Sequence, residues 1–309
     1  MPVAGDFRRK PAMYGADMAP SITTGSGTAN GIDFGWLECG SGSLALCLHG
    51  FPDSAHGWRH TLPALAEAGF RAVAPFTRGY APTSVAPDGM YQTGALSADA
   101  NALHEILGGD ASAVIIGHDW GAPSAYGAAA DEPDRWRQVV GMAVPPGSAF
   151  GAAFVSNLDQ IKRSWYMFYF QHPLSDMVVP SNDLAFIDML WRDWSPGYDG
   201  AVDAENCKAS LRDPAHLSAA LGYYRATIGA GPRDPRYDAI QAKSQTELTQ
   251  PVLYLHGAND GCIGVEIAES VRVHSPWVTV EIIPGAGHFL QLEQPGIVNR
   301  RIVEWLTAR

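Results

Sequence analysis

The chain has 309 residues, of which 46% are hydrophobic and 17% charged, so it can form one large or two modest domains with a substantial core. The net charge of -11 and the pI near 5.3 argue against nucleic acid or an anionic membrane as a partner. The sequence contains no uninterrupted apolar run of membrane-spanning length. These features predict a soluble acidic protein of the cytoplasm.

The cysteines and the first residues predict neither a metal site nor secretion. Cys39, Cys47, Cys207 and Cys262 form no CxxC pair and have no metal-ligand spacing, so we expect reduced thiols and no metal. No apolar segment follows the basic residues 8–10, so no secretory signal is recognised, and residues 1–20 are expected to form an N-terminal arm. The sequence leaves open whether the chain forms a homodimer.

The first half of the chain alternates between strand and helix patterns. Residues 21–38 alternate weakly and contain turn glycines, which predicts an antiparallel hairpin at a sheet edge. Buried strands are then predicted at residues 44–48, 71–76, 113–116 and 138–144, and helices at 58–68, 96–107 and 124–130. This alternation predicts an α/β fold with a mostly parallel central sheet flanked by helices.

The alternation stops between residues 147 and 238, a segment rich in aromatic residues and helix formers. We expect it to be a helical cap domain, inserted above the carboxyl edge of the sheet, with helices at 154–171, 183–192 and 211–228. Strands at 251–255 and 278–283 and helices at 265–273 and 297–308 then complete the sheet. The core domain would comprise residues 21–146 and 239–309.

One stretch, residues 111–122, has the layout of a nucleophile elbow. Its apolar strand leads into Gly117-His118-Asp119-Trp120-Gly121 and then directly into a helix. The turn is tight and strained, so a Cβ at either glycine would collide with a neighbouring element. The exposed side chain at such a turn is here a carboxylate, Asp119. A strand followed by an Asp helix cap is the simpler alternative.

Three candidate catalytic residues follow three separate strands, in the order Asp119, Asp260, His288. Catalytic groups gather at the carboxyl ends of the strands in open α/β sheets, so these distant positions can meet there. The order is nucleophile, acid and histidine, with Asp at the position that Ser occupies in lipases. The alternatives are a turn role for Asp260 and a packing role for His288.

Over nearly its whole length the chain resembles α/β-hydrolases of the epoxide hydrolase and haloalkane dehalogenase group. The matching motifs are His49-Gly50-Phe51-Pro52, Arg78-Gly79-Tyr80, Gly117-His118-Asp119-Trp120-Gly121, Gly257-Ala258-Asn259-Asp260 and Gly287-His288-Phe289. Two positions depart from the family pattern: Ala81 replaces the usual glycine, and Thr77 stands where an acidic residue is common. These positions are expected to shape a turn under the site.

The resemblance implies a role for each site residue. Asp119 would attack a saturated carbon, because a carboxylate can displace a leaving group there and form an ester of its own side chain. His288, oriented by Asp260, would then activate water as a general base. The backbone N–H groups of Phe51 and Trp120 would form the oxyanion hole. The side chains expected to contact substrate are Phe51, Trp120, Trp165 and His118. No organic cofactor is implied.

The cap residues favour an epoxide as the electrophile. Opening an epoxide creates an alkoxide, which needs a proton donor. The segments around Tyr166 and Tyr224 are similar to the two tyrosine motifs of epoxide hydrolases, and these residues are the expected donors. Each could instead be a packing aromatic, since Tyr169 and Tyr223 lie beside them in the sequence.

We therefore expect an epoxide hydrolase that converts a small apolar epoxide to a vicinal diol. The alternative is a haloalkane dehalogenase with the same nucleophile, in which Trp120 and Trp165 would hold the halide. A charged haloacid is disfavoured, because Ala122, Pro123 and Ser124 occupy the places where fluoroacetate-type enzymes carry arginines. A hydrolase-like protein that binds ligand without turnover is the third and weakest interpretation.

Overall fold

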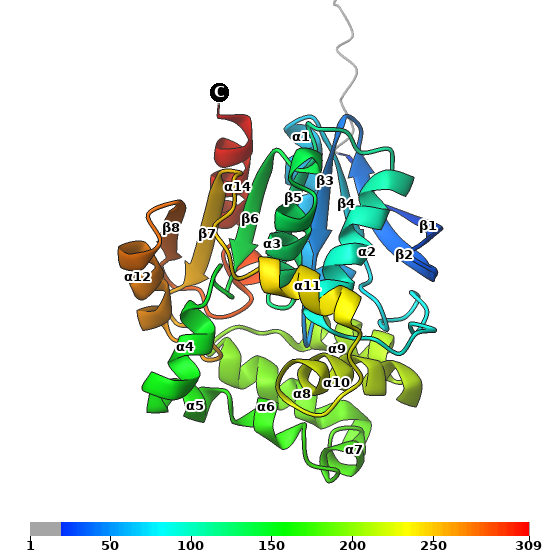
Figure 1. Cartoon of the computed structure of the whole chain (residues 1–309), viewed down its shortest axis with the longest axis vertical. Helices are drawn as coiled ribbons and strands as arrows, with labels where there is room; N and C mark the ends of the chain where they lie inside the picture. The colour runs from blue at the N-terminus through cyan, green and yellow to red at the C-terminus, as the bar shows by residue number, and fades with distance from the viewer. Residues whose placement is uncertain (1–19, 309) are drawn as a thin grey trace, which may run out of the picture.

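A computed structural model describes residues 20–308 and contains one eight-stranded sheet (Figure 1). The N-terminal arm expected at residues 1–20 lies, except for its last residue, outside the described part of the chain. The strands are β1 (Thr23–Ala29), β2 (Ile32–Gly40), β3 (Ser43–Leu48), β4 (Phe70–Pro75), β5 (Val114–His118), β6 (Gln138–Met142), β7 (Val252–Gly257) and β8 (Val278–Ile283).

The sheet is mostly parallel, as the sequence predicts. Its strand order is β1-β2-β4-β3-β5-β6-β7-β8. The hairpin of β1 and β2 lies at one edge, and β2 pairs antiparallel with β4, whereas all later pairs are parallel. In the register, Leu48 pairs with Gly117 and His118 pairs with Met142. The loops that follow β3, β5 and β6 therefore start at the same edge of the sheet.

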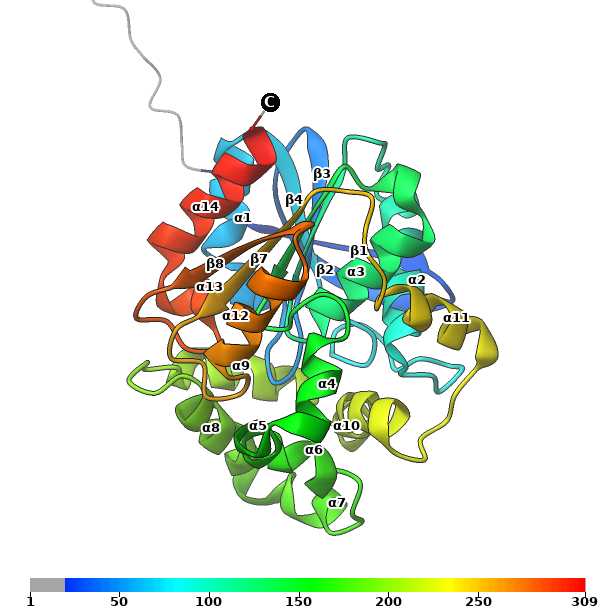
Figure 2. The ribbon, with the colours of Figure 1, turned by 60° about the vertical axis from the view of Figure 1, so that its left-hand side comes forward.

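Helices cover both faces of the sheet, because successive residues of its central strands point to opposite sides. In β5, Ile116 packs in the core formed with α1 (Thr61–Glu67) and α14 (Pro295–Thr307), and Ile115 in the core formed with α2 (Thr93–Ile106) and α3 (Gly121–Asp131). Figure 2 shows α1 and α14 on one side and α2 and α3 on the other. The remaining core elements are η1 (Ala55–Trp58), η2 (Pro133–Arg135), α11 (Pro235–Lys243), α12 (Val265–His274) and α13 (Leu290–Glu293).

Seven helices between β6 and β7 gather at one end of the molecule, and we call them the helical insertion (Figure 1, green to yellow). They are α4 (Ala149–Ser156), α5 (Leu158–Arg163), α6 (Trp165–Tyr169), α7 (Ser175–Val178), α8 (Ser181–Trp194), α9 (Ala201–Leu211) and α10 (Pro214–Ile228). Among residues 20–308, no helix has the length and apolarity needed to cross a membrane.

The insertion is helical as predicted, but its helix boundaries differ from those in the sequence pattern. The single helix predicted at 154–171 is three helices, because Asn157 leaves the helical conformation and its side chain accepts hydrogen bonds from the N–H groups of Asp159 and Gln160. α10 begins at Pro214 rather than at residue 211, because Asp213 caps it and proline suits the first turn. α9 and α11 were not predicted.

Candidate active site

Asp119 stands on a sharp turn between β5 and α3, in the left-handed conformation with φ of 51°. The two flanking glycines make this turn possible. A Cβ at Gly117 would lie 2.1 Å from the carbonyl oxygen of Gly121, and a Cβ at Gly121 would lie 2.0 Å from that of Leu48. The backbone therefore has the geometry of a nucleophile elbow.

The structure brings Asp119, His288 and Asp260 together from three loops. His288 Nε2 lies 3.6 Å from Asp119 Oδ2, and Nδ1 donates a hydrogen bond of 3.0 Å to Asp260 Oδ2. Asp260 Oδ1 in turn accepts hydrogen bonds from the N–H groups of Cys262 and Ile263, at 2.7 and 2.9 Å. All three catalytic candidates are buried. The imidazole is thus oriented by one carboxylate while it faces the other.

The two carboxylates control the charge of His288. Burial alone lowers the pKa of this imidazole, but the negative charges of Asp260 and Asp119 outweigh that effect and raise it to about 10. Burial likewise would raise the pKa of Asp260, but the adjacent His288 lowers it below its ordinary value. His288 is therefore cationic at neutral pH while both neighbours are charged.

Backbone N–H groups at the ends of β3 and β5 surround the Asp119 carboxylate. The N–H of Phe51 donates a 2.7 Å hydrogen bond to Oδ1. Trp120 occupies the N-cap position of α3, and a Cβ on Gly50 would lie only 2.4 Å from its backbone nitrogen. The N–H groups of Phe51 and Trp120 thus lie on adjacent chain segments beside Asp119. The structure therefore shows one backbone donor bound to the Asp119 carboxylate, that of Phe51, with the Trp120 nitrogen close by.

Tyr166 and Tyr224 reach the same cavity from the helical insertion. Both line it together with Asp119, and their rings pack edge to face with centroids 5.6 Å apart. The Tyr166 hydroxyl lies 3.3 Å from the Sγ atom of Cys262, and the buried Tyr224 hydroxyl has no hydrogen-bond partner among residues 20–308. Burial raises the pKa of both phenols well above its ordinary value, so both remain protonated and can donate.

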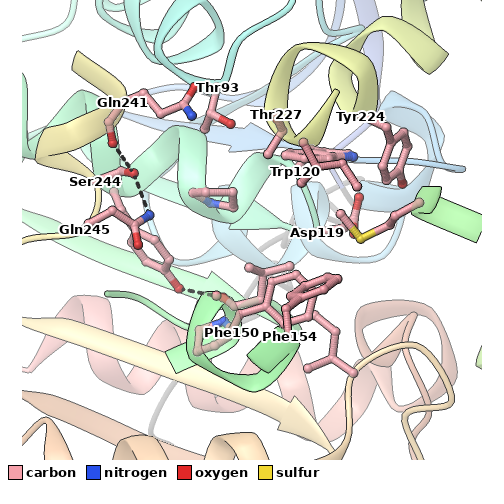
Figure 3. Close-up of a pocket in the computed structure, with 18 of the residues that line it drawn as sticks. Thr93, Asp119, Trp120, Phe150, Phe154, Tyr224, Thr227, Gln241, Ser244 and Gln245 are labelled. Atoms are coloured by element: carbon pink, nitrogen blue, oxygen red, sulfur yellow. Dashed lines mark hydrogen bonds between the residues drawn. The ribbon is translucent and has the colours of Figure 1, made fainter. Parts of the chain in front are cut away.

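The cavity that joins these groups has a volume of about 210 Å³ (Figure 3). Apolar residues make up most of its wall, and Asp119 is the only charged residue among the described residues that line it. The lining residues are Thr93, Asp119, Trp120, Pro123, Tyr126, Val144, Pro145, Gly147, Phe150, Gly151, Phe154, Tyr166, Met167, Tyr224, Thr227, Ile228, Gln241, Ser244, Gln245 and Ile263. Such a cavity suits a small, mainly apolar molecule.

Two residues expected to contact substrate lie elsewhere. Trp165 is 42% exposed, packs against Tyr169 and Phe186, and lines a separate surface hollow. It is therefore no part of the cavity wall, because its helix turns Tyr166 inward instead. His118 is fully buried, and its Nε2 donates a 2.9 Å hydrogen bond to the backbone oxygen of His288. It braces the histidine loop rather than lining the cavity.

Phe51 also stays out of the cavity wall, although it contacts the residues that form it. Its side chain is fully buried and packs edge to face against Tyr224, with ring centroids 5.4 Å apart. Its contribution to the site is therefore a backbone donor and a support for one phenol. Of the four side chains expected to contact substrate, Trp120 is the one that lines the cavity.

One group of residues has the composition of a metal site. Within residues 20–308, Asp260, Cys262 and His288 bring their ligand atoms within 4.8 Å of one another. Both carboxylate oxygens of Asp260 are already hydrogen-bonded, and burial raises the pKa of the Cys262 thiol, which keeps it protonated. The geometry fits a hydrogen-bond network, and we assign no metal to it.

Sequence reasoning missed several residues of this site. Cys262 carried no recognisable pattern, although its position two residues after Asp260 could have placed it beside the histidine. Thr93, Gln241, Ser244 and Gln245 line the cavity from α2 and from the region of α11, a helix that was not predicted. No local sequence signal connects them to Asp119.

The sheet order, the elbow and the helical insertion define the class of the protein, which is that of the α/β hydrolases. The family model described as the alpha/beta hydrolase fold matches residues 46–295. A crystal structure of Bacillus megaterium epoxide hydrolase in complex with an inhibitor has a TM-score of 0.76 at 26% identity, with 92% of this chain and 100% of that chain covered.

Curated relatives narrow the family. Epoxide hydrolase B of Mycobacterium tuberculosis is 36% identical over 336 aligned positions, covering 86% of this chain and 91% of the relative. Epoxide hydrolase 3 of Xenopus tropicalis is 31% identical over 290 positions, covering 90% of this chain and 75% of the relative. The chain belongs to the epoxide hydrolase family of the α/β hydrolases, which confirms the resemblance seen in its motifs.

Proposed function

We propose that this protein hydrolyses small apolar epoxides to vicinal diols through a covalent ester of Asp119. The observation that carries the proposal is that one cavity contains both a carboxylate that faces an imidazole and two phenol groups. The Asp119 carboxylate faces His288 on the core side, and two protonated phenols reach the cavity from the helical insertion. The two curated relatives named above are both epoxide hydrolases, and their similarity to this chain supports the same chemistry.

In the first step, Asp119 attacks an epoxide carbon. Oδ1 accepts a hydrogen bond from the Phe51 N–H, so Oδ2 is the freer oxygen and forms the new C–O bond. The epoxide C–O bond breaks, and its electron pair moves to the epoxide oxygen. Tyr166 or Tyr224 donates a proton to that oxygen, which becomes a hydroxyl group. The product of this step is a hydroxyalkyl ester of Asp119.

In the second step, water hydrolyses the ester. Esterification removes the negative charge of Asp119, so the pKa of His288 falls. The proton of His288 passes to the phenolate left by the first step, which restores the tyrosine and leaves a neutral imidazole that can act as a base. His288 takes a proton from water as the water oxygen attacks the Asp119 carbonyl carbon. The Oδ1 oxyanion is held by the N–H groups of Phe51 and Trp120. As this intermediate collapses, His288 gives its proton to the leaving alkoxide oxygen, so the diol is released. The carboxylic acid that remains on Asp119 then passes its proton to His288, which restores the carboxylate.

The helical insertion would act as a cap in this scheme. It supplies both proton donors, and with the core it encloses a cavity of about 210 Å³ that is mainly apolar. Exclusion of bulk water strengthens the hydrogen bonds to the epoxide oxygen. It also limits the water that can reach the ester to what the cavity admits.

One observation favours dehalogenation as a second candidate. Trp120 lines the cavity, and its buried Nε1–H has no hydrogen-bond partner among residues 20–308, so it could hold a halide ion. The second indole of such a halide site, Trp165, lies outside the cavity. Because the cavity has both tyrosine donors but only one of the two indoles, epoxide hydrolysis is favoured over dehalogenation.

A substrate assay separates the two candidates. The purified protein is incubated with styrene oxide and 1,2-epoxyhexane, and with 1-bromohexane in parallel. Diol formation without bromide release is the expected result. Bromide release without diol formation would identify a dehalogenase, and neither product would remove both candidates.

A trapping experiment tests the covalent step. In His288→Gln, attack by Asp119 should proceed while ester hydrolysis slows by about 10³-fold or more, so the ester accumulates. Intact mass spectrometry should detect the mass of one epoxide, located on the peptide that contains Asp119. The matched control, His288→Gln with Asp119→Asn, should remain unmodified. An adduct on another residue would contradict the assignment of the nucleophile.

A further inference from the structure

The cavity has a second polar region, away from Asp119, that the proposed reaction does not use. Its side chains come from α2, from α11 and from the turn after α11; they are Thr93, Gln241, Ser244 and Gln245. Figure 3 shows these four on one side of the cavity and Asp119, Trp120 and Tyr224 on the other. We call the four residues the distal polar end.

The wall that completes the cavity beyond these two polar ends is largely apolar, with Val144, Phe150, Phe154 and Ile263 among its members. No lysine, arginine or histidine is among the described residues that line the cavity, so the distal polar end offers no positive charge to an anion. A ligand that fills the cavity from Asp119 to this end would be apolar in the middle and neutral at its tip.

Gln241 has hydrogen-bonding capacity that the protein leaves unused. Gln241 is half-buried, and its Oε1 is a buried oxygen with no hydrogen-bond partner among residues 20–308. Leaving a buried amide oxygen unpaired costs free energy, and a bound ligand that donates a hydrogen bond to this oxygen would remove that cost. Ser244 differs, because its Oγ donates to the backbone oxygen of Gln241 at 2.7 Å and accepts from Gln245 Nε2 at 3.2 Å.

α11 is held firmly enough to make Gln241 a selective contact. A Cβ at Gly94 would lie 1.9 Å from the backbone oxygen of Tyr237, so α2 and α11 pack too closely for any side chain at this position. At the start of α11, Gln92 bonds the backbone of Asp234 in both directions, with Oε1 accepting at 2.5 Å and Nε2 donating at 3.3 Å. A donor or acceptor on a fixed helix discriminates better than one on a mobile loop.

We propose that Gln241 determines substrate choice by binding a neutral hydroxyl or amide group at the end of the epoxide remote from the oxirane ring. This inference rests on the proposed function for the identity of the reacting group. It adds that the preferred substrate is bifunctional, with an apolar chain between the epoxide and a neutral polar tip. The hydroxyl of Thr93, which also lines this end, is the second contact for that tip.

The test compares epoxides that differ only at the tip. Terminal epoxides of about six to ten carbons, ending in either a methyl or a hydroxyl group, are assayed with the wild type and with Gln241→Met, which keeps the chain length and removes the amide. At the best length, kcat/KM of the wild type should favour the hydroxyl tip by about tenfold or more. Gln241→Met should bring that ratio to about one, because the hydroxyl series loses its contact with the amide.

Gln294→Met provides a matched control, because it makes the same change at a glutamine that does not line the cavity. It should keep the ratio of the wild type. A ratio near one in the wild type, or a ratio that Gln241→Met leaves unchanged, would overturn the role of Gln241 while diol formation continued to support the proposed function.

Binding of products makes the test independent of turnover. Calorimetry compares octane-1,2,8-triol with octane-1,2-diol, and tighter binding of the triol by the wild type, lost in Gln241→Met, is the expected result. If no epoxide is turned over, the proposed function fails. The binding of the triol relative to the diol then tests by itself whether Gln241 binds a polar tip. Equal binding of both compounds by the wild type would then overturn it.

Discussion

The two sides of the cavity hold their reactive groups in different ways. On the core side, Asp119 and Asp260 each accept hydrogen bonds from backbone N–H groups, and His288 is hydrogen-bonded to Asp260. On the insertion side, Tyr166 touches only the thiol of Cys262 through its hydroxyl, and the Tyr224 hydroxyl has no partner among residues 20–308. Aromatic packing holds the two phenols instead.

This difference follows from charge. A buried carboxylate or imidazolium is stable only when fixed donors or an opposite charge surround it. A buried phenol is neutral, so packing alone can position it while its hydroxyl remains free for a ligand. In the proposed mechanism, the core side forms and hydrolyses the ester, and the insertion side selects which electrophile is activated.

The largest effect should come from the core side, at Asp119. Replacement Asp119→Asn keeps the shape and the acceptor for the Phe51 N–H but removes the nucleophilic charge. We expect diol formation to fall by at least about 10³-fold, with a melting temperature close to that of the wild type. Initial rates with styrene oxide and a thermal melt measure the two quantities. If Asp119→Asn kept more than a tenth of the wild-type rate of diol formation, Asp119 would not be the nucleophile. The contrast drawn between the two sides of the cavity would then be wrong.

The core side could be predicted from the sequence because its geometry is local. The strand pattern, the glycines at 117 and 121 and the order of Asp119, Asp260 and His288 place each group at a strand end, and parallel strands end at one edge. The fold was predictable for the same reason, since the alternation of buried strands and helices specifies a parallel sheet.

The insertion side is tested by removing its hydroxyls. Tyr166→Phe and Tyr224→Phe should each lower kcat for epoxides by about 10- to 100-fold, and the double replacement by more, because the leaving alkoxide loses its proton donors. The matched control is Tyr169→Phe, whose ring stacks on Phe186 outside the cavity and which should keep normal activity.

Rapid-quench kinetics sharpen that prediction. Formation of the Asp119 ester should slow in the tyrosine variants, while hydrolysis of an ester already formed should keep its rate. A double variant with normal epoxide turnover would remove both phenols from the proposed mechanism and leave only the core side of the comparison standing.

The insertion side could be predicted only in part. Tyr166 and Tyr224 lie in recognisable motifs, but the inward face of a short helix depends on where that helix starts, and the break at Asn157 was not predicted. Trp165, which was expected to contact substrate, lies on the outer side of α6. The distal contact Gln241 lies on a helix whose pairing with α2 is a tertiary property that no local pattern encodes.

Asp53 is the exception on the core side, because one of its buried carboxylate oxygens, Oδ2, has no hydrogen-bond partner among residues 20–308. Burial is the main cause that raises its pKa from 3.8 to about 8, and the negative charges of Asp203 and Asp119 add to this effect. A hydrogen bond from the Ser54 backbone and the charge of Arg59 oppose the increase only in part. Between these pH values the folded protein holds a proton that the unfolded chain releases, so stability falls as pH rises through this window.

Asp53→Asn removes that titration. The variant should gain stability relative to the wild type as pH rises from about 4 to 8, by up to about 6 kcal/mol, and the gain should level off above pH 8. Chemical denaturation at a series of pH values measures the difference. A gain that shrank as pH rose would mean that Asp53 is ionised and partnered like the other core-side carboxylates.

The smallest effect should come from Trp165, on the outer side of α6. Its ring is 42% exposed and packs on Tyr169 and Phe186, so Trp165→Ala removes surface packing and should change kcat/KM for epoxides by less than about twofold. Steady-state kinetics with short and long epoxides provide the measurement. A loss above tenfold confined to long substrates would mean that α6 turns on binding and brings Trp165 to the ligand. In that case the two tyrosines would reach their positions only after the substrate binds. The insertion side of the site would then form by induced fit and would not be preorganised.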